Sequence, residues 1–584
     1  MKDKQKIRSR ARESRAAIER MYIAMRHLFI RGSYKPLGVS GESLIDAMKT
    51  LSPEIYGSVS DPERVELDGL LYVFQRLPQG IEDCRYIRLI TREGYEKSNF
   101  DILVPPKRRR NCYRIDSEQM FIEMTRGRSD VYDVLTHLTF MYIEAEKIRK
   151  NSTDHKGRVQ RDWQMLERIV EAEKKGDDFN KEVAFTYLSK ILNQSYVDTV
   201  AAAEKFEKAD KVNSLFYVAY NLGKRSMEEA EEGLSREISF SRGLREKIGH
   251  HIYGEIWANK IKEALHEDGL IDRPLHIISA NMHSVMNCLY AREALQSQKK
   301  NMPLDQLASI LSQGENEHLR QKVKKFAERN GMRCIEDTTG TNIEVQIIDL
   351  TRVPFRQLPE EININARYIE DKKPVILVMD YAFGEQAYES MDELLKPYVK
   401  DEVKTPLNVK SIAVMGKAGI LTGEKGDIMV ANSHVFEGTA DNYPVDNKFS
   451  IEDFEGHGMH VVEGTMITVL GTSLQNKDIL RYFYNSSWRA VGLEMEGAHY
   501  QKAIQSASKI RGSVSQDIKL LYAYYASDNP LISGQTLASG SLGLDGVKPT
   551  YLITVKILSK IMEGDTGQKN NRLPLDNKGD APKD

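Results

Sequence analysis

Short apolar runs alternate with segments of helical periodicity throughout the second half of the chain, and this alternation restricts the fold more than any other feature. Eight runs have the length and apolar character of buried strands: residues 275–280, 343–348, 375–379, 411–415, 427–431, 465–470, 490–493 and 520–526. Helical patterns separate several of them, notably 386–398, 498–509 and 551–562. Because strands that alternate with helices form sheets covered on both faces, we predict an α/β domain over residues 271–563. In such domains, ligands bind beyond the carboxyl ends of the strands.

The first 270 residues are predicted to form a mainly α-helical region. Apolar side chains recur at helical spacing over residues 130–150. Ser129 directly precedes this segment, and we interpret it as the N-cap. Residues 180–267 contain no proline and are rich in strong helix formers, which favours several consecutive helices. Two shorter runs, 71–74 and 86–90, are interpreted as strands of a small mixed insert. The sequence leaves the role of this region open.

Composition excludes several classes of protein. The chain has 584 residues, with 83 Lys+Arg and 85 Asp+Glu, a balance that gives no overall attraction to nucleic acid or an anionic membrane. We therefore interpret the basic run at 107–110 as a solvated loop. Four widely spaced cysteines predict neither a disulfide framework nor a metal site, and no cofactor is expected.

The two ends of the chain lead to two further expectations. Residues 1–15 lack the apolar core of a signal peptide, and no apolar window is long enough to span a membrane, so we expect a cytoplasmic protein. Residues 564–584 hold few apolar side chains and are predicted to be a disordered tail.

Two segments that follow predicted strands carry candidate binding groups. Gly416 and Gly419 come after the strand at 411–415, and glycines in such a turn let backbone N–H groups approach a ligand closely. Asp528 ends the run at 520–526, where burial can raise the pKa of a carboxyl group and keep a proton for donation.

A Glu-Met-Glu turn lies between the strand at 490–493 and the helix at 498–509. Glu494 and Glu496 place two carboxylates there, on either side of Met495. Taken singly, these groups have structural explanations, since a glutamate at a helix start complements the helix dipole and an aspartate often opens a turn. The order and spacing of all the segments together favour a functional interpretation.

That order resembles the nucleoside phosphorylase superfamily, and within it the catalytic domain of AMP nucleosidase. Four elements match: the glycine-containing segments 415–421 and 426–430, the G-T-x-x-T strand at 464–468, and the S-D-x-P-L element at 527–531. The resemblance covers residues 370–562 and implies a mixed sheet flanked by helices. It also implies that the ligand is a small-molecule purine nucleoside or nucleotide. Because members assemble as dimers, trimers or hexamers, it further implies a homo-oligomer.

The resemblance assigns roles to individual residues. Asp528 corresponds to the acid that protonates or hydrogen-bonds purine N7, Glu496 to the glutamate that holds the ribose hydroxyls, and Met495 to the methionine packed against the sugar. The remaining implied substrate-binding positions are Glu494, Gly416, Lys417, Gly419, Thr468 and Ser527. These roles suit the chemistry, because breaking an N-glycosidic bond places positive charge on the ribose and negative charge on the base.

Departures from the family pattern bear on the nucleophile. Val414 occupies a position where phosphorylases carry an arginine, and the segment 279–283 has neither the usual glycine nor an arginine. The sequence therefore favours hydrolysis over phosphorolysis, with Lys417 as the one obvious cation at the matched turns. Two alternatives stay open: a purine nucleoside phosphorylase with an altered phosphate site, and a catalytically silent nucleotide sensor whose helical half is the output.

Overall fold

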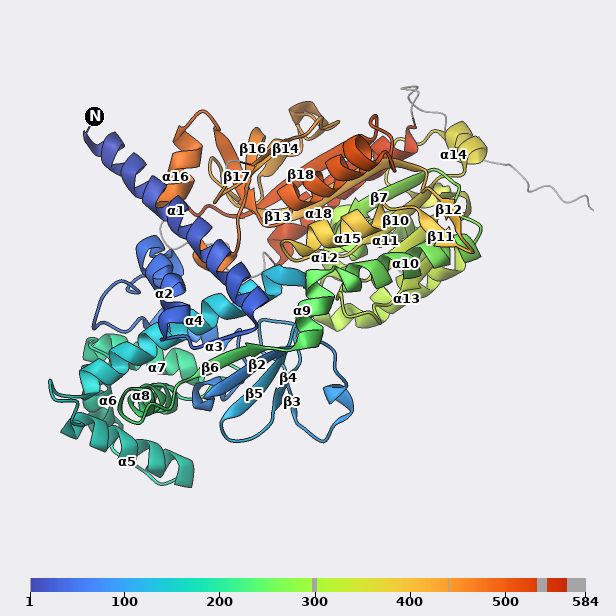
Figure 1. Ribbon diagram of the computed structural model, residues 1–584. Helices are drawn as coiled ribbons and strands as arrows, with labels where there is room; N and C mark the ends of the chain where they lie inside the picture. The colour runs from blue at the N-terminus through green and yellow to red at the C-terminus, as the bar shows by residue number, and fades with distance from the viewer. Residues whose placement is uncertain (1, 297–301, 440, 533–542, 565–584) are drawn as a thin grey trace, which may run out of the picture.

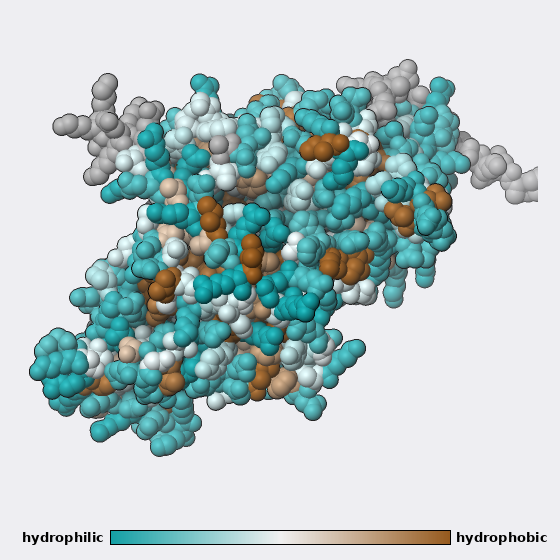
Figure 2. All heavy atoms as spheres, in the orientation of Figure 1, coloured by the Kyte–Doolittle hydropathy of each residue, from teal (hydrophilic) through white to brown (hydrophobic). Residues whose placement is uncertain are grey.

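The computed structural model describes residues 2–296, 302–439, 441–532 and 543–564, which form two main sheets and the helices around them (Figure 1). The predicted disordered tail, apart from residue 564, lies outside the described residues. No helix in these four ranges is long and apolar enough to cross a membrane. On the face shown in Figure 2, hydrophobic residues are scattered among hydrophilic ones.

The N-terminal region is mainly helical, as predicted. Its helices are α1 (Lys2–Arg31), α2 (Val39–Leu51), α3 (Leu67–Phe74), α4 (Gly127–Ser152), α5 (Arg161–Lys175), α6 (Lys181–Ile191), α7 (Tyr196–Glu207), α8 (Leu215–Glu231), α9 (Arg242–Gly249) and α10 (Ile252–Glu267). The strand predicted at 71–74 is wrong, because those residues lie in α3. Leu67, Leu70 and Phe74 are buried at helical spacing there, and a four-residue apolar run does not distinguish a strand from part of a helix.

The same region also holds a six-stranded sheet of which only one strand was predicted, that at 86–90. The strand order is β1-β6-β2-β5-β4-β3. The strands are β1 (Ser33–Tyr34), β2 (Tyr86–Ile90), β3 (Ile102–Leu103), β4 (Cys112–Arg114), β5 (Gln119–Glu123) and β6 (Glu237–Phe240). Each has five residues or fewer, which is too short for a clear alternating pattern, and the central strand β2 pairs in parallel with both β5 and the distant β6.

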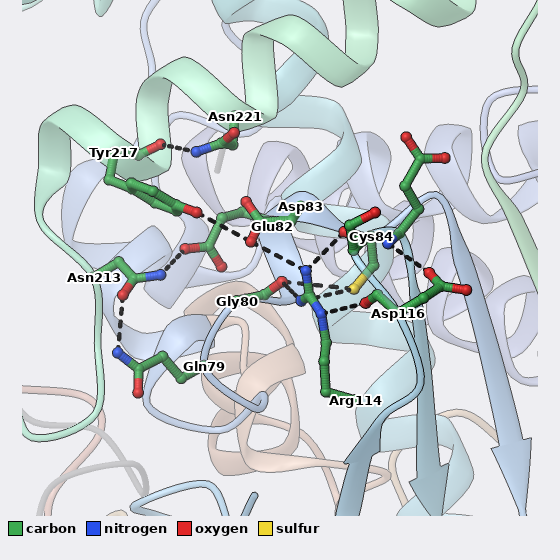
Figure 3. A network of polar contacts seen from close by, with 12 residues as sticks. Gln79, Gly80, Glu82, Asp83, Cys84, Arg114, Asp116, Asn213, Tyr217 and Asn221 are labelled. Carbon is green, nitrogen blue, oxygen red and sulfur yellow. Dashed lines mark hydrogen bonds and ion pairs between the residues drawn. The ribbon is translucent and has the colours of Figure 1, made fainter. Parts of the chain in front are cut away.

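A polar network joins this sheet to α8 (Figure 3). From β4, the Arg114 guanidinium donates to the Gly80 carbonyl at 2.6 Å and pairs with Asp83 at 3.3 Å, and the Tyr217 hydroxyl of α8 donates to Asp83 at 3.1 Å. Burial raises the pKa of the neighbouring Glu82 to about 7. Because every main partner lies within the N-terminal region, we assign this network a structural role.

The ten-stranded sheet of the second half contains all eight predicted strands. It consists of β7 (Leu275–Ser279), β8 (Met332–Ile335), β9 (Val345–Asp349), β10 (Val375–Met379), β13 (Val409–Ile420), β14 (Ile428–Phe436), β15 (Asn442–Pro444), β16 (Val461–Thr468), β17 (Ala490–Glu494) and β18 (Lys519–Asp528). The strands β11 (Tyr398–Lys400) and β12 (Val403–Thr405) form a separate hairpin. The short strands β8 and β15 were not predicted.

Strand β13 belongs to both the open part and the closed part of this sheet. Its first residues pair in parallel with β7, and its last two, Gly419 and Ile420, pair antiparallel with Leu493 and Gly492 of β17. β18 pairs with β13 and β14, β14 with β16, and β16 with β17, so five strands close into a ring. At this end of the sheet, the three-residue strand β15, which pairs with β14, forms the edge.

Helices cover the sheet on both faces, which confirms the predicted α/β fold. Along β10, Ile376 and Val378 face one apolar core, and Val375, Leu377 and Met379 face another. The first core includes residues of α11 (Met282–Ala294), α12 (Leu304–Leu311), α13 (Glu317–Arg329), α14 (Ala366–Lys372) and α18 (Val547–Met562). The second includes residues of α10, α15 (Gln386–Leu394) and α17 (Gly497–Gln505).

The N-terminal region packs directly on the closed part of the sheet. Met21 and Met25 of α1 share an apolar core with Ile467 of β16, Leu493 of β17 and Phe483 of α16 (Lys477–Asn485). Figure 1 shows α1 running beside α16. This packing brings the N-terminal helices to the strand end that carries the Glu-Met-Glu turn.

Candidate active site

A cavity of about 290 Å³ opens where β7, β10 and β17 end and where β13 and β18 run side by side. Four of the predicted site residues line it: Gly416, Lys417, Glu494 and Glu496. The other lining residues are mostly aromatic, aliphatic or small, and they include Tyr381, Tyr500, Tyr524 and Tyr525. A largely apolar cavity with a few polar groups suits an organic ligand with a flat ring and a hydroxylated part.

Glu496 is held at the entrance to α17 by a distant loop. Its Oε1 accepts a 2.9 Å hydrogen bond from the backbone N–H of Gly384, in the loop after β10. Burial raises the pKa of Glu496 to about 8, and the nearby carboxylate of Glu494 acts in the same direction. The carboxyl group is thus oriented before any ligand binds.

The Glu494 carboxylate stabilises the Glu-Met-Glu turn through hydrogen bonds. Its Oε1 accepts a 2.5 Å hydrogen bond from the Thr468 hydroxyl, and its Oε2 accepts from the backbone N–H groups of Glu496 and Gly497. The Thr468 hydroxyl in turn accepts from the N–H of Ala498 at 3.0 Å. Thr468 therefore lies behind Glu494, and the geometry favours a positioning role for both residues.

Asp528 is the last residue of β18 and is 3% exposed. Its Oδ1 contacts the Ser527 hydroxyl, which also donates to the Ala418 carbonyl at 3.1 Å. In the described part of the chain, its buried Oδ2 has no hydrogen-bond partner. Burial raises the pKa of Asp528, whereas the positive charge of Lys417 lowers it. Burial thus shifts the pKa of this carboxyl group upward, the direction that a proton donor requires.

Asp528 and Glu496 differ in their position relative to the cavity. Among the described residues, the cavity lining includes Glu496 and omits Asp528, whose electrostatic link to the cavity is Lys417. Met495, which was predicted to contact the sugar, is not among the described residues of the cavity lining and instead lines a second recess together with Phe383.

The glycines of the predicted turn after residue 415 lie within a strand. β13 continues to Ile420, so Gly416 and Gly419 belong to it and the predicted loop is wrong. Gly419 has Asp528 beside it on β18 and Leu493 beside it on β17, where β13 changes partners. Small residues suit such a close approach of three strands.

Tyrosines of β18 and α17 form part of the lining that the sequence did not single out. The Tyr524 hydroxyl lies 2.9 Å from His434 Nε2, and burial lowers the pKa of that histidine to about 3. The Tyr500 hydroxyl lies 2.9 Å from the Ser279 hydroxyl. In the sequence, the tyrosines of an apolar strand cannot be told from ordinary core residues.

The start of α4 supports the loop that holds Glu496. The Ser129 hydroxyl accepts a 2.8 Å hydrogen bond from the N–H of Glu385, and Arg128 pairs with the Glu385 carboxylate at 3.1 Å. The predicted N-cap role of Ser129 is wrong, because α4 begins at Gly127 and Arg126 is its N-cap residue. The Ser129 side chain instead binds the backbone of the loop at Glu385, more than 250 residues further along the chain.

The basic run at 107–110 is not a solvated loop throughout. Arg108 pairs with Asp133 at 2.7 Å, and Arg110 pairs with Asp130 at 2.7 Å and with Asp133 at 2.8 Å. Arg109 alone of these three arginines is exposed. Tertiary pairing with α4 withdraws the other two from solvent.

Comparisons with known proteins give structural similarity at low sequence identity. A 5′-methylthioadenosine/S-adenosyl homocysteine nucleosidase from Campylobacter jejuni is 11% identical, over 49% of this chain and 99% of its own, with a TM-score of 0.28. The futalosine hydrolase of Helicobacter pylori is 13% identical over 50% of this chain and 99% of its own (TM-score 0.29). A purine nucleoside phosphorylase from Toxoplasma gondii is 12% identical over 50% and 92% (TM-score 0.27).

No curated protein matches the sequence. One family model does match, over residues 42–309 and 293–563, which together make up most of the chain. The protein therefore belongs to that family, a family of unknown function designated DUF6909.

Proposed function

We propose that the protein is an N-ribosyl hydrolase that cleaves the glycosidic bond of a purine nucleoside or nucleotide and releases the free base. The observation that carries this proposal is the pair of glutamates at the cavity. Glu494 uses both carboxyl oxygens to hold the turn, whereas Glu496 is oriented by Gly384 and lines the cavity. The carboxylate of Glu496 is therefore the one oriented to bind a ligand in the cavity.

The ribose end of the reaction requires a negative charge. An ionised Glu496 accepts hydrogen bonds from vicinal ribose hydroxyls and stabilises the positive charge that develops on the sugar. Burial raises the pKa of Glu496 to about 8, so its ionised form is disfavoured until a positive charge lies beside it; the cationic sugar of the transition state supplies that charge and interacts with the carboxylate strongly.

The base end requires a proton. Asp528 combines a raised pKa with a buried oxygen that has no hydrogen-bond partner in the described ranges, and both are properties of a general acid that protonates a purine ring nitrogen. General acid catalysis of this type contributes roughly 10²- to 10⁴-fold to turnover.

The cavity lining favours water as the nucleophile. Among the described residues of the lining, Lys417 is the one cation, and Val414 stands where a phosphorylase has an arginine. A phosphate dianion needs several donors to offset its desolvation, whereas neutral water does not. Assembly as a homo-oligomer and a cytoplasmic location remain predictions.

The test is incubation of the purified full-length protein with AMP, adenosine or methylthioadenosine, followed by chromatographic detection of free adenine and of the sugar product. We expect ribose or ribose 5-phosphate at a similar rate with and without inorganic phosphate. Ribose 1-phosphate that forms only when phosphate is present would establish the phosphorylase alternative. Tight binding of all substrates without release of base would establish the nucleotide sensor.

A further inference from the structure

Four arginines and two aspartates gather around the first turns of α4, and two of the arginines, Arg108 and Arg126, lie over the Phe383 ring in the loop after β10. The arginines are Arg76, Arg108, Arg110 and Arg126, and the aspartates are Asp130 and Asp133. Positive charge therefore exceeds negative charge in a largely buried cluster. Such an imbalance is energetically costly unless an anion offsets it.

Among the described residues, two members of this cluster, Arg76 and Arg126, have no ion pair; Arg76 donates to the Tyr72 carbonyl at 2.9 Å and lies over the Tyr72 ring. Arg108 and Arg110 pair with Asp130 and Asp133 at 2.7 to 2.8 Å, although Nη1 of Arg110 and Oδ2 of Asp130 have no hydrogen-bond partner among the described residues. Among the residues that the structure describes, Arg126 has no carboxylate within 4.0 Å, and its buried Nε has no hydrogen-bond partner. The Arg126 guanidinium instead lies 4.6 Å from the centre of the Phe383 ring.

This contact places Arg126 next to the ribose end of the site. Phe383 directly precedes Gly384, whose N–H holds Glu496. Arg126 and Glu496 therefore flank the same two-residue segment, and the arginine's charge acts to lower the pKa of Glu496. Burial lowers the pKa of Arg126 itself, so a neighbouring anion would stabilise its charged form.

We propose that Arg126 binds a phosphate group beside the ribose, so that the N-terminal region takes part in substrate recognition. This inference rests on the proposed N-ribosyl hydrolase function and deepens it. The phosphate has two possible sources: the 5′-phosphate of a nucleotide substrate, or free inorganic phosphate. The first accords with the Arg-free cavity lining, because a 5′-phosphate extends away from the bond that breaks.

The experiment compares the wild type with Arg126→Gln, on AMP and on adenosine, each with and without inorganic phosphate. We expect Arg126→Gln to lower kcat/KM for AMP by about 10- to 100-fold and to leave adenosine within about twofold, since a charged hydrogen bond to phosphate contributes an effect of this size. Arg109→Gln is the matched control, because Arg109 is a nearby exposed arginine that carries the same charge. Arg126→Lys should recover part of the activity on AMP.

The remaining outcomes separate the phosphate sources from failure of the proposal. A loss confined to a phosphate-dependent rate on adenosine would assign Arg126 to free phosphate. Equal losses on both substrates without any phosphate effect would overturn the proposal, provided that thermal melting shows a folded variant. If the wild type turns over neither substrate, the proposed function fails, and calorimetry then decides this inference. Tighter binding of AMP than of adenosine, abolished by Arg126→Gln, would support it, and equal binding would overturn it.

Discussion

The backbone N–H of Gly384 donates a 2.9 Å hydrogen bond to Oε1 of Glu496, across 112 positions of the sequence. The bond joins the loop after β10 to the start of α17, and Ser129 of the N-terminal region holds the neighbouring N–H of Glu385. The orientation of the candidate ribose-binding carboxylate therefore depends on three distant segments of the chain.

The hydrogen bond from Gly384 depends on a conformation that glycine permits. Gly384 has a φ of 56°, and a Cβ at this position would clash with the Ser129 side chain. We expect Gly384→Ala to displace the loop and to lower activity at least 10-fold. The free energy of unfolding should fall by more than the about 1–2 kcal/mol that a left-handed conformation alone costs a residue other than glycine. Gly157→Ala is the control, because Gly157 has a φ of 78° with open space around it. Equal melting temperatures for both variants would refute the role of the clash.

Asp528→Asn tests the proton donor. Asparagine keeps the shape of the side chain but lacks an acidic proton, so turnover on a purine substrate should fall about 10²-fold or more with normal folding. Asp446→Asn, on the exposed surface, should retain wild-type turnover. Unchanged turnover in Asp528→Asn would remove Asp528 from the mechanism.

Glu496→Gln tests the contact with the sugar. Only an ionised carboxylate accepts both ribose hydroxyls, so the variant should lose far more kcat/KM, about 10-fold or more, on a ribonucleoside than on its 2′-deoxy analogue. Glu463→Gln, at an exposed position on β16, serves as the control. Losses of equal size on the two sugars would show that Glu496 does not hold the diol.

The pH profile of Lys417→Ala tests the electrostatic link between Lys417 and Asp528. A proton donor is active below its pKa, so activity falls as pH rises through the pKa of Asp528. Lys417 lowers that pKa, and its removal should raise it and shift this limb of the profile to higher pH. Lys425→Ala, which removes a surface lysine paired with Asp545 at 2.9 Å, should leave the limb in place. A shift to lower pH would contradict the assignment.

Glu437 provides a test of stability against pH away from the cavity. Burial raises its pKa to about 8, so the folded state holds this proton more tightly than the unfolded state does. Its favourable contribution to the free energy of unfolding is complete below about pH 4.5 and is lost as pH rises through 8, at about 1.4 kcal/mol per pKa unit. Glu437→Gln cannot ionise and should gain melting temperature over the wild type between pH 5 and pH 9. A constant difference across this range would show that Glu437 does not titrate.

Local patterns in the sequence were sufficient to predict eight of the ten strands in the large sheet of the second half. The predicted strand at 375–379 coincides with β10, because five consecutive apolar residues buried on both faces form a signal that needs no distant partner. Helix α4 and the order of the strand-end motifs were predicted in the same way. The motif order also brought Glu496 and Asp528 forward as candidate site residues, and the structure finds both buried or partly buried at strand ends.

Only the tertiary structure decided which distant segments meet. The ring of five strands, the six-stranded N-terminal sheet and the continuation of β13 through Gly416 and Gly419 all depend on pairing between strands far apart in the chain. The proximity of Arg126 and Gly384 to Glu496 depends on the packing of α4 against the loop after β10. Periodicity reports whether a segment buries one face or two, but it does not encode the identity of the partner. For this protein, the sequence by itself determined the mainly helical character of the N-terminal region, the eight longer strands of the second half and the candidate chemical groups, and packing between the halves decided how those groups are held.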